Sequence, residues 1–395
     1  MAMPNNERIG WGEQRGECER VDSGADAWRL ESAHGRFFAD RSAGGQTEDC
    51  YSVALGTDCH SEFGRSSGGC GATALPAALG RASVTCMVSR AEIAAAASRI
   101  ASHVRHTPVL RLAGAELGVR CPVTLKLELL QHSGSFKPRG VFNRLLSEPP
   151  PPAGVIAASG GNHGAAVAYA ARALSVPAEI FVPVLTPQAK VTRIAGYGAR
   201  VVQTGETYAD ALAASRLRQA ETGALEVHAY DHADVLAGQG TVAREFEQDV
   251  PDLTHVLVAT GGGGLIGGMA AWYAGSVQLV SVEPAGCPAL HDALHAGRPV
   301  DAAVGGAAAD SLGARQVGGL MFPIAQHYVA AAVLVTDAAI VAAQRSLWDR
   351  FRLIAEPGGT TALAALVSGA FVPPDGAQVG VVVCGGNTDP SKVAS

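Results

Sequence analysis

Short apolar runs alternate with helical stretches along most of the chain, and this alternation limits the folds it can adopt. The runs are bounded by glycine, proline or a helix, as strands are. Strands that alternate with helices indicate parallel sheets covered on both faces. The predicted strands are residues 123–130, 154–159, 178–183, 199–204, 255–260, 277–283 and 379–384, and two of the predicted helices are residues 136–146 and 163–174.

The chain has 395 residues, which is long enough for two packed domains. We therefore predict an α/β fold with two open α/β/α domains and mostly parallel sheets. Glycine-rich turns follow several of the predicted strands, and such sheets bind ligands at those ends. The cleft between the two domains is the expected place for a ligand.

The first 86 residues differ from the rest of the chain. They are rich in Gly, Ser, Arg and acidic residues, lack a sustained period and contain five of the eight cysteines. We predict that residues 1–86 form a poorly ordered N-terminal extension. A helix follows directly, because Ser89 and Glu92 form a capping-box signature. Met87 stands just before this helix and is a candidate second start of translation.

Composition and charge exclude several classes of protein. Hydrophobic residues make up 48% of the chain and charged residues 17%, with a net charge of −6 and no basic stripe, which argues against nucleic-acid binding. Residues 256–282 lack charge, but four consecutive glycines inside them favour a strand, a tight loop and a core helix over a membrane span. The first residues do not resemble a secretory signal, and the cysteines lack zinc-site spacing, so we expect a cytoplasmic protein with free thiols.

The first motif with chemical meaning is SGSFKPRG at residues 133–140. Lys137 lies at the start of a predicted helix, beside Phe136. A partly desolvated lysine has a lowered pKa and a nucleophilic amine. A surface lysine near a helix start is the competing interpretation, although a cation at a helix N-terminus is unfavourable.

The second motif is SGGNHG at residues 159–164, between a predicted strand and a predicted helix. Backbone N–H groups at such a helix start can hold a carboxylate. The side chains of Ser159 and Asn162 add hydrogen-bond donors. An ordinary strand-to-helix turn with an N-cap would show the same pattern.

The third motif is the run of four glycines, Gly261 to Gly264, followed by Leu265 at the start of a predicted helix. Successive amides in such a run can point at one anion, and the helix adds its dipole, so the run predicts a phosphate-binding loop. It is not a Walker loop, because no GK[ST] follows. A dinucleotide fingerprint belongs to the first strand of its fold, whereas this run lies late in the chain, which disfavours a nucleotide-dependent oxidoreductase.

The fourth motif is CGGN at residues 384–387, after the last predicted strand. The thiol of Cys384 could face a ring nitrogen. Taken alone, Cys384 is better interpreted as a small buried core residue.

Together and in this order, the four motifs resemble those of the fold-type II pyridoxal-phosphate (PLP) enzymes, most closely the serine/threonine dehydratase branch. The resemblance covers residues 88–392, and AGQGT at residues 237–241, Glu283 and Glu356 also fit it. It implies that Lys137 holds PLP as an imine, that Phe136 stacks on the ring, and that Cys384 faces the pyridine nitrogen. It also implies that Gly261, Gly262, Gly263, Gly264 and Leu265 bind the phosphate, that Asn162 bonds the 3′-oxygen, and that Ser159, Gly160, Asn162 and His163 line the substrate site.

Three departures from the family pattern narrow the prediction. Serine racemases resemble this chain but place a second serine where Gly160 lies, so racemisation is not expected. Their divalent-cation site needs an acidic residue at the position of Ala289, so we predict no metal although Glu283 is present. The chain ends just after CGGN, and we expect no C-terminal regulatory domain.

The predicted function is that of a PLP-dependent L-threonine/L-serine dehydratase (ammonia-lyase) of amino-acid metabolism. The resemblance implies that Lys137 removes the Cα proton, that the cofactor phosphate helps the β-hydroxyl leave, and that a 2-oxo acid and ammonia form. We expect a homodimer in which residues 88–152 and 226–395 form the large PLP-binding domain and residues 153–225 the small domain. The open alternatives are a 3-hydroxyaspartate dehydratase, a serine racemase, a threonine synthase-like enzyme and a PLP-binding homologue without catalysis.

Overall fold

The computed structural model describes residues 88–394 and, before them, only the backbone of five short strands. The chain divides into two compact units, residues 1–78 and 79–395. In the first unit β1 pairs with β2, and β3, β4 and β5 form an antiparallel sheet. The rest of residues 1–87 lies outside the described residues, so the poor order expected of residues 1–86 stays a prediction. The five strands are β1 (Gly10–Trp11), β2 (Gln14–Arg15), β3 (Cys18–Arg20), β4 (Ala27–Ser32) and β5 (Gly35–Asp40).

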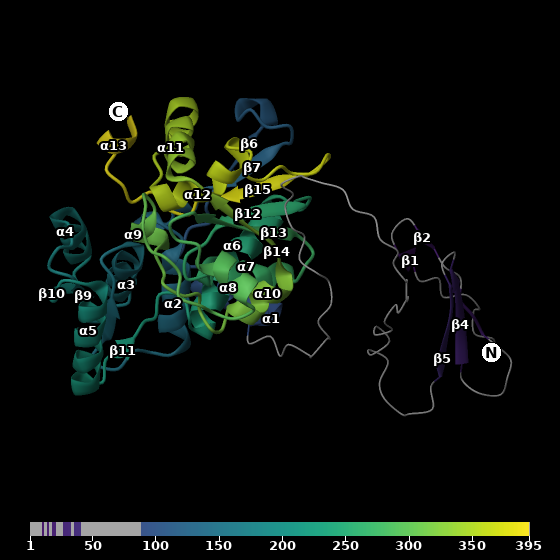
Figure 1. Cartoon of the computed structure of the whole chain (residues 1–395). Coiled ribbons are helices and arrows are strands. Elements are labelled where there is room, and N and C mark those ends of the chain that lie inside the picture. The colour runs from purple at the N-terminus through teal and green to yellow at the C-terminus, as the bar shows by residue number, and fades with distance from the viewer. Residues whose placement is uncertain are drawn as a thin grey trace. The chain divides into compact units, whose positions relative to one another are not determined.

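The second unit contains a six-stranded sheet with the order β14-β13-β12-β15-β7-β6 (Figure 1). All its neighbouring strands are parallel except β6 and β7, which are antiparallel. The parallel strands β12 and β15 lie at its centre and are almost entirely buried, as expected for strands covered on both faces. The strands are β6 (Val109–Leu112), β7 (Val123–Lys126), β12 (His255–Ala259), β13 (Gln278–Pro284), β14 (Val329–Val335) and β15 (Val379–Val382).

A second, four-stranded sheet has the order β10-β9-β8-β11 and is parallel throughout. Its strands are β8 (Val155–Ala158), β9 (Ala178–Val182), β10 (Arg200–Gln203) and β11 (Leu225–Glu226). Successive residues face opposite sides: Val155 packs with α3 and α4, whereas Ile156 packs with α5. Helices therefore cover both faces, as predicted for an open α/β/α sheet.

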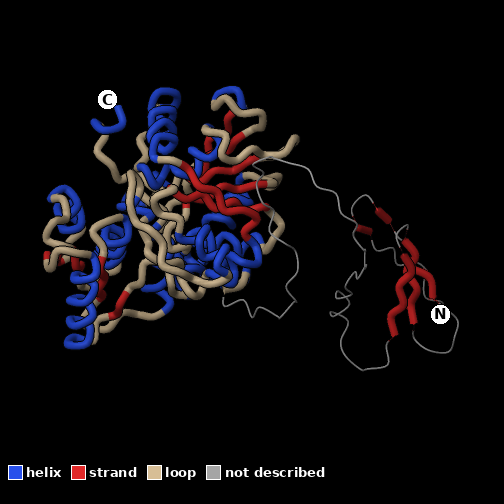
Figure 2. Tube along the Cα trace, viewed as in Figure 1, coloured by secondary structure: helices blue, strands red, loops and turns tan. Residues whose placement is uncertain are grey.

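The helices surround the two sheets (Figure 2). Helices α11 and α12 lie on one side of the six-stranded sheet and α1, α6 and α7 on the other (Figure 1). The predicted capping box of α1 is present, because the Ser89 side chain accepts from the Glu92 N–H and Glu92 accepts from the Ser89 N–H. The helices are α1 (Arg90–Ile100), α2 (Lys137–Ser147), α3 (Asn162–Ala173), α4 (Gln188–Gly196), α5 (Tyr208–Thr222), α6 (Ala233–Asp249), α7 (Gly264–Tyr273), α8 (Ala289–Ala296), α9 (Ala309–Leu312), α10 (Phe322–Tyr328), α11 (Asp337–Phe351), α12 (Pro357–Val367) and α13 (Ser391–Ala394), with 3-10 turns η1 (Gly114–Glu116), η2 (Glu128–Leu130) and η3 (His132–Gly134).

Helix α2 links the two sheets. Its Val141, Phe142 and Leu145 pack in the core around the four-stranded sheet, although they precede residue 153. At its other end, the N–H of Phe136 donates to the carbonyl of Cys384, next to the six-stranded sheet. The division into residues 88–152 and 226–395 on one side and 153–225 on the other therefore stays a proposal, supported by separate cores around each sheet.

Two sequence-based expectations can be compared with the structure here. The prediction of a strand over residues 123–130 is wrong beyond Lys126, because η2 follows and turns the Glu128 carboxylate inward to Arg139. The uncharged residues 256–282 form β12, the glycine loop, α7 and most of β13, as predicted. Within the described part of the chain, no helix has the length and apolar character that crossing a membrane requires.

Candidate active site

Lys137 is the first residue of α2, directly after Phe136. Its Nζ donates to the backbone carbonyl of Ala229 at 2.8 Å and lies 5.1 Å from the centre of the Phe136 ring. Burial lowers the pKa of this amine to about 8, against a smaller opposing effect of Cys384. The predicted desolvated, nucleophilic lysine is therefore consistent with its surroundings.

Lysine is rare in this chain, which has only Lys126, Lys137, Lys190 and Lys392. Lys126 is fully buried and contacts Glu245 and Asp249, and Lys190 contacts Asp310. These two ammonium groups are neutralised by carboxylates. Lys137 instead donates to the carbonyl of Ala229, which is neutral. A carbonyl stabilises the charged amine less than a carboxylate does.

The segment before Lys137 lies against the CGGN segment. Phe136 N donates to the carbonyl of Cys384 at 3.1 Å, and Gly386 N donates to that of Gly134 at 2.9 Å. Ser135 and Gly385 form an antiparallel bridge between these contacts. Two motifs that are far apart in the sequence are thereby fixed side by side.

The thiol of Cys384 is buried and lies 3.5 Å from the carbonyl of Gly358, to which it donates. Burial raises the pKa of this thiol far above its usual value, and the nearby Glu356 adds to the effect. Cys384 is therefore a neutral thiol, not a thiolate. Cys384 is a buried residue, as expected when it is considered alone, and its backbone carbonyl accepts from the N–H of Phe136 beside Lys137.

The SGGNHG segment connects β8 to α3. Ser159 Oγ accepts from Gly161 N at 3.3 Å, and Asn162 is the first residue of the helix. Gly160 leaves little spare space, because a Cβ added there would lie 3.0 Å from Cγ2 of Thr186. The first N–H groups of α3 have no acceptor within the helix, so this end can receive a carboxylate.

His163 is buried, and its Nε2 lies 2.7 Å from the carbonyl of Val227. Burial lowers the pKa of this ring to about 3, with a further contribution from Lys137. Because a carbonyl only accepts, Nε2 carries the proton and Nδ1 is an acceptor that has no hydrogen-bond partner. The ring therefore cannot donate to a substrate carboxylate, whereas the backbone N–H of His163 can.

The glycine loop precedes α7 and packs against Tyr230. Its glycines leave no room for a side chain on that face. A Cβ added to Gly262 would lie 2.4 Å from the Tyr230 ring, and one added to Gly264 would lie 2.8 Å from Cβ of Tyr230. Gly263 has φ 85°, a left-handed conformation that favours glycine. Unpaired N–H groups at the start of α7 complete a cradle that suits the phosphate of PLP.

Tyr230 and Ala229 are candidate site residues that the sequence analysis missed. The carbonyl of Ala229 accepts a hydrogen bond from Lys137, and Tyr230 lies against the glycine loop. This segment therefore connects the two motifs. It follows β11 and contains no glycine, and neither Ala229 nor Tyr230 carries a charge that would mark it. Glu356, which accepts a hydrogen bond from Asn162, was noted only as fitting the family pattern.

A metal site was predicted to be absent in spite of Glu283. Both carboxyl oxygens of Glu283 accept backbone N–H groups at the start of α8, from Leu290 and His291, each at 2.7 Å. Burial raises the pKa of Glu283 to about 8. Glu283 therefore serves as a helix-capping group in this structure.

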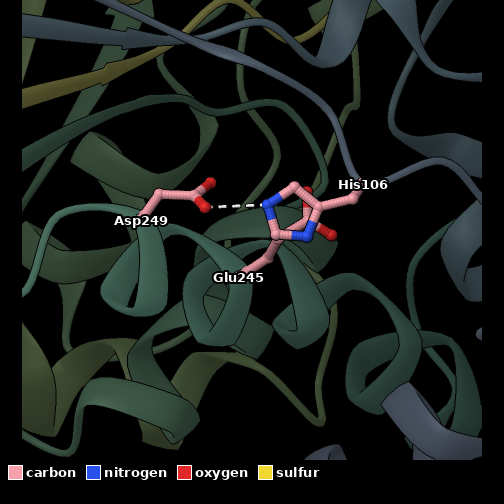
Figure 3. Close-up of side chains that lie close together, drawn as sticks. All are labelled: His106, Glu245 and Asp249. Carbon is pink, nitrogen blue, oxygen red and sulfur yellow. Dashed lines mark hydrogen bonds and ion pairs between the residues drawn. The ribbon is translucent and has the colours of Figure 1, made fainter.

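One trio of potential ligands, His106, Glu245 and Asp249, lies close together in the described residues (Figure 3). His106 Nε2 contacts Asp249 at 2.7 Å, but the remaining carboxylate oxygens already contact cations. Lys126 bonds to both acids, and Arg139 bonds to Glu245. We interpret the trio as part of an ion-pair network.

Comparison with known proteins identifies the family of the chain. The family model of the pyridoxal-phosphate dependent enzymes matches residues 100–385. An L-threonine ammonia-lyase of Geobacter sulfurreducens is 38% identical over 301 residues, which cover 75% of each chain. A phenylserine dehydratase of Ralstonia pickettii is 36% identical over 309 residues, which cover 76% of this chain and 94% of the relative.

Solved structures show the same relationship. The structure of maize serine racemase superposes with a TM-score of 0.73 at 31% identity, and the match covers 78% of this chain and 96% of the racemase. The predicted fold-type II architecture and the predicted cofactor, PLP, are both confirmed. The chain belongs to the family of pyridoxal-phosphate dependent enzymes.

Proposed function

We propose that this chain is a PLP-dependent ammonia-lyase that converts L-threonine or L-serine into a 2-oxo acid and ammonia. The observation that carries the proposal is the surroundings of Lys137. Its amine has a pKa lowered to about 8, contacts a carbonyl and lies next to a neutral thiol. The similarity to an L-threonine ammonia-lyase over most of the chain supports the same reaction.

The roles proposed for the site residues rest on the family resemblance and are supported by where the residues lie. We assign cofactor binding to one group and substrate binding to a second group that shares Asn162. The cofactor group is Phe136, Lys137, Asn162, Gly261, Gly262, Gly263, Gly264, Leu265 and Cys384. The substrate group is Ser159, Gly160, Asn162 and His163, with His163 acting through its backbone N–H.

Bound PLP supplies an electron sink next to the Cα of an amino acid. The amine of Lys137 removes the Cα proton, and a pKa of about 8 leaves about a tenth of it neutral at pH 7, far more than in an ordinary lysine. The carbonyl of Ala229 orients that nitrogen. Cys384 cannot protonate a pyridine nitrogen as an acid would, because burial raises the pKa of its thiol. Early loss of the β-substituent is thereby favoured over transamination.

Serine racemisation is the main competing activity, because the maize enzyme with this fold is a serine racemase. Gly160 argues against it, since a two-base racemase needs a side chain there to protonate the opposite face of Cα. Thr186 Cγ2 would lie only 3.0 Å from a Cβ at this position, so Thr186 fills the adjoining space. A 3-hydroxyaspartate dehydratase, a threonine synthase-like enzyme and a non-catalytic PLP-binding protein stay further alternatives.

The test is a substrate panel for the purified, PLP-loaded enzyme. It contains L- and D-threonine, L- and D-serine, phenylserine and 3-hydroxyaspartate, with 2-oxo acid, ammonia and product chirality as readouts. We expect stoichiometric 2-oxo acid and ammonia from L-threonine or L-serine and no inverted amino acid. Inversion without ammonia, or no turnover of any member by a PLP-loaded enzyme, would contradict the proposal.

We further propose that two copies of the chain form a homodimer and that the enzyme acts in the cytoplasm. The dimer rests on the family resemblance. The cytoplasmic location rests on the spacing of the cysteines, which favours free thiols in a reducing compartment. Sedimentation of the purified protein and fractionation of the native host test these two proposals.

A further inference from the structure

A chain of side-chain hydrogen bonds joins the two sheets through Asn162. Asn387 Nδ2 donates to the carbonyl of Ser133 at 2.8 Å and to Oδ1 of Asn162 at 2.6 Å. Asn162 Nδ2 donates in turn to Oε1 of Glu356 at 2.5 Å. Asn162 begins α3 beside the four-stranded sheet, whereas Glu356 precedes α12 and Asn387 follows β15 beside the six-stranded sheet.

The direction of this chain is set at one end by a backbone carbonyl. Because the carbonyl of Ser133 only accepts, Asn387 must present its amide nitrogen, and the same nitrogen faces Asn162. Asn162 must therefore turn its oxygen to Asn387 and its nitrogen to Glu356. An amide nitrogen carries two hydrogens, so one hydrogen of Asn162 Nδ2 stays for a ligand.

Two glycines leave the space that the side chains of this hydrogen-bond series occupy. A Cβ on Gly134, whose φ is 79°, would lie 2.4 Å from Oδ1 of Asn387. A Cβ on Gly385 would lie 2.1 Å from Oε1 of Glu356. The side chains of Asn387 and Glu356 therefore pack directly against the backbone of these two glycines. The Glu356 N–H also donates to the Gly385 carbonyl at 3.1 Å, which fixes the start of α12 there.

We propose that Glu356 and Asn387 are positioning residues that fix the amide of Asn162, so that its remaining Nδ2 hydrogen serves the cofactor. This inference rests on the assignment of Asn162 to cofactor binding in the proposed function. Glu356 acts as an acceptor and Asn387 as a donor. The two positions must therefore tolerate different substitutions, and this difference separates the inference from a general loss of packing.

The experiment uses the holoenzyme and measures the dissociation constant of PLP and the visible absorbance of the bound cofactor. Glu356→Gln keeps a carbonyl that can accept from Asn162, and we expect its PLP affinity and spectrum to match the wild type. Glu356→Leu has no acceptor, and we expect PLP to bind roughly tenfold more weakly or worse, with a changed spectrum.

At the other end of the chain, Asn387→Asp replaces the donor with an acceptor that faces two oxygens. We expect it to weaken PLP binding more than Asn387→Ala, which removes the group without repulsion. Thermal unfolding of each variant in its PLP-free form identifies any variant that fails to fold. If Asn387→Asp does not fold, the comparison of Glu356→Gln with Glu356→Leu decides the question alone.

The matched control is Glu179→Leu, which removes a carboxylate as Glu356→Leu does. Glu179, on the four-stranded sheet, pairs with Arg200 and Arg218. We expect Glu179→Leu to leave PLP affinity and spectrum unchanged. The inference is overturned if Glu356→Leu and Asn387→Asp bind PLP like the wild type, or if Glu356→Gln is as impaired as Glu356→Leu. Failure of the wild type itself to bind PLP would instead contradict the proposed function.

Discussion

The guanidinium of Arg139 contacts the carboxylate of Glu245 at 3.0 Å, and both side chains are buried. Arg139 lies two residues after Lys137 in α2. Arg139 also pairs with Glu128 at 2.7 Å, and Lys126 pairs with Glu245 at 2.7 Å. Together these contacts join α2 to α6 and η2. The helix that begins with Lys137 is thus held by buried charges within its first turn.

Glu245→Gln tests the strength of this buried network. Burial would raise the pKa of Glu245, but Arg139 and Lys126 outweigh it and lower the pKa to about 2. The carboxylate therefore stabilises the fold above its ordinary pKa near 4.5, and this stability is lost as pH falls towards 2. We expect Glu245→Gln to lower the free energy of unfolding by about 3 kcal/mol at pH 7, because Arg139 and Lys126 each lose one of two carboxylate partners. Urea unfolding followed by circular dichroism measures it.

Glu247→Gln is the matched control for that variant. Glu247 pairs with Arg90 at 3.1 Å, but both side chains are substantially exposed. Such a pair contributes about 1 kcal/mol or less. Equal losses in Glu245→Gln and Glu247→Gln, or a loss in Glu245→Gln that does not shrink between pH 4.5 and 2, would show that Glu245 is not a buried charge anchor.

The pKa of Lys137 predicts how fast the PLP-free enzyme captures its cofactor. Only the neutral amine attacks the cofactor aldehyde, and burial lowers the pKa from its ordinary 10.5 to about 8. The capture rate should therefore rise about tenfold per pH unit below pH 8 and level off above it. Stopped-flow absorbance gives the profile. A rate that keeps rising to pH 10 would mean that the amine has an ordinary pKa.

Cys384 is predicted to set the reaction's selectivity. Cys384→Ser keeps a neutral hydrogen-bonding group, and we expect its turnover to stay within about tenfold of the wild type. Cys384→Asp introduces an acid that can protonate a ring nitrogen, and should increase transamination relative to elimination. Chromatography of the cofactor after turnover measures the pyridoxamine form. If Cys384→Asp has the product ratio of the wild type, the thiol does not control selectivity.

The glycine loop can be tested at Gly262. A Cβ there would lie 2.4 Å from the Tyr230 ring, so Gly262→Ala must displace the tyrosine or the loop. We expect PLP to bind at least about tenfold more weakly, while binding of pyridoxal, which lacks the phosphate, changes little. Fluorescence titration with both compounds gives the two affinities. Equal weakening for both would indicate that the loop does not bind the phosphate.

Several elements of the fold could be predicted because glycines, prolines and helix starts mark their ends in the sequence. Lys137, Asn162 and the four glycines each stand where a strand or turn gives way to a helix, and that position is visible in the sequence. Strand β14 was not predicted, since alanine fills much of it and gives little strand signal. Strand β11 was missed because two residues carry no period.

The contacts that complete the site could not be predicted from local pattern. Lys137 meets a carbonyl 92 residues away, and Asn162 meets Glu356 across 194 residues. Such pairs depend on how the two sheets and α2 pack, which no local period encodes. The orientation and protonated nitrogen of the His163 ring could not be predicted either, because both depend on the carbonyl of Val227.

The most direct test of the central assignment is to locate the cofactor on the chain. The chain has four lysines, so borohydride reduction of the holoenzyme followed by peptide mass spectrometry can resolve each of them. The reduced cofactor should be attached to Lys137, and Lys137→Ala should lose both this label and the release of 2-oxo acid. A label on Lys126, Lys190 or Lys392, or turnover retained in Lys137→Ala, would contradict the assignment.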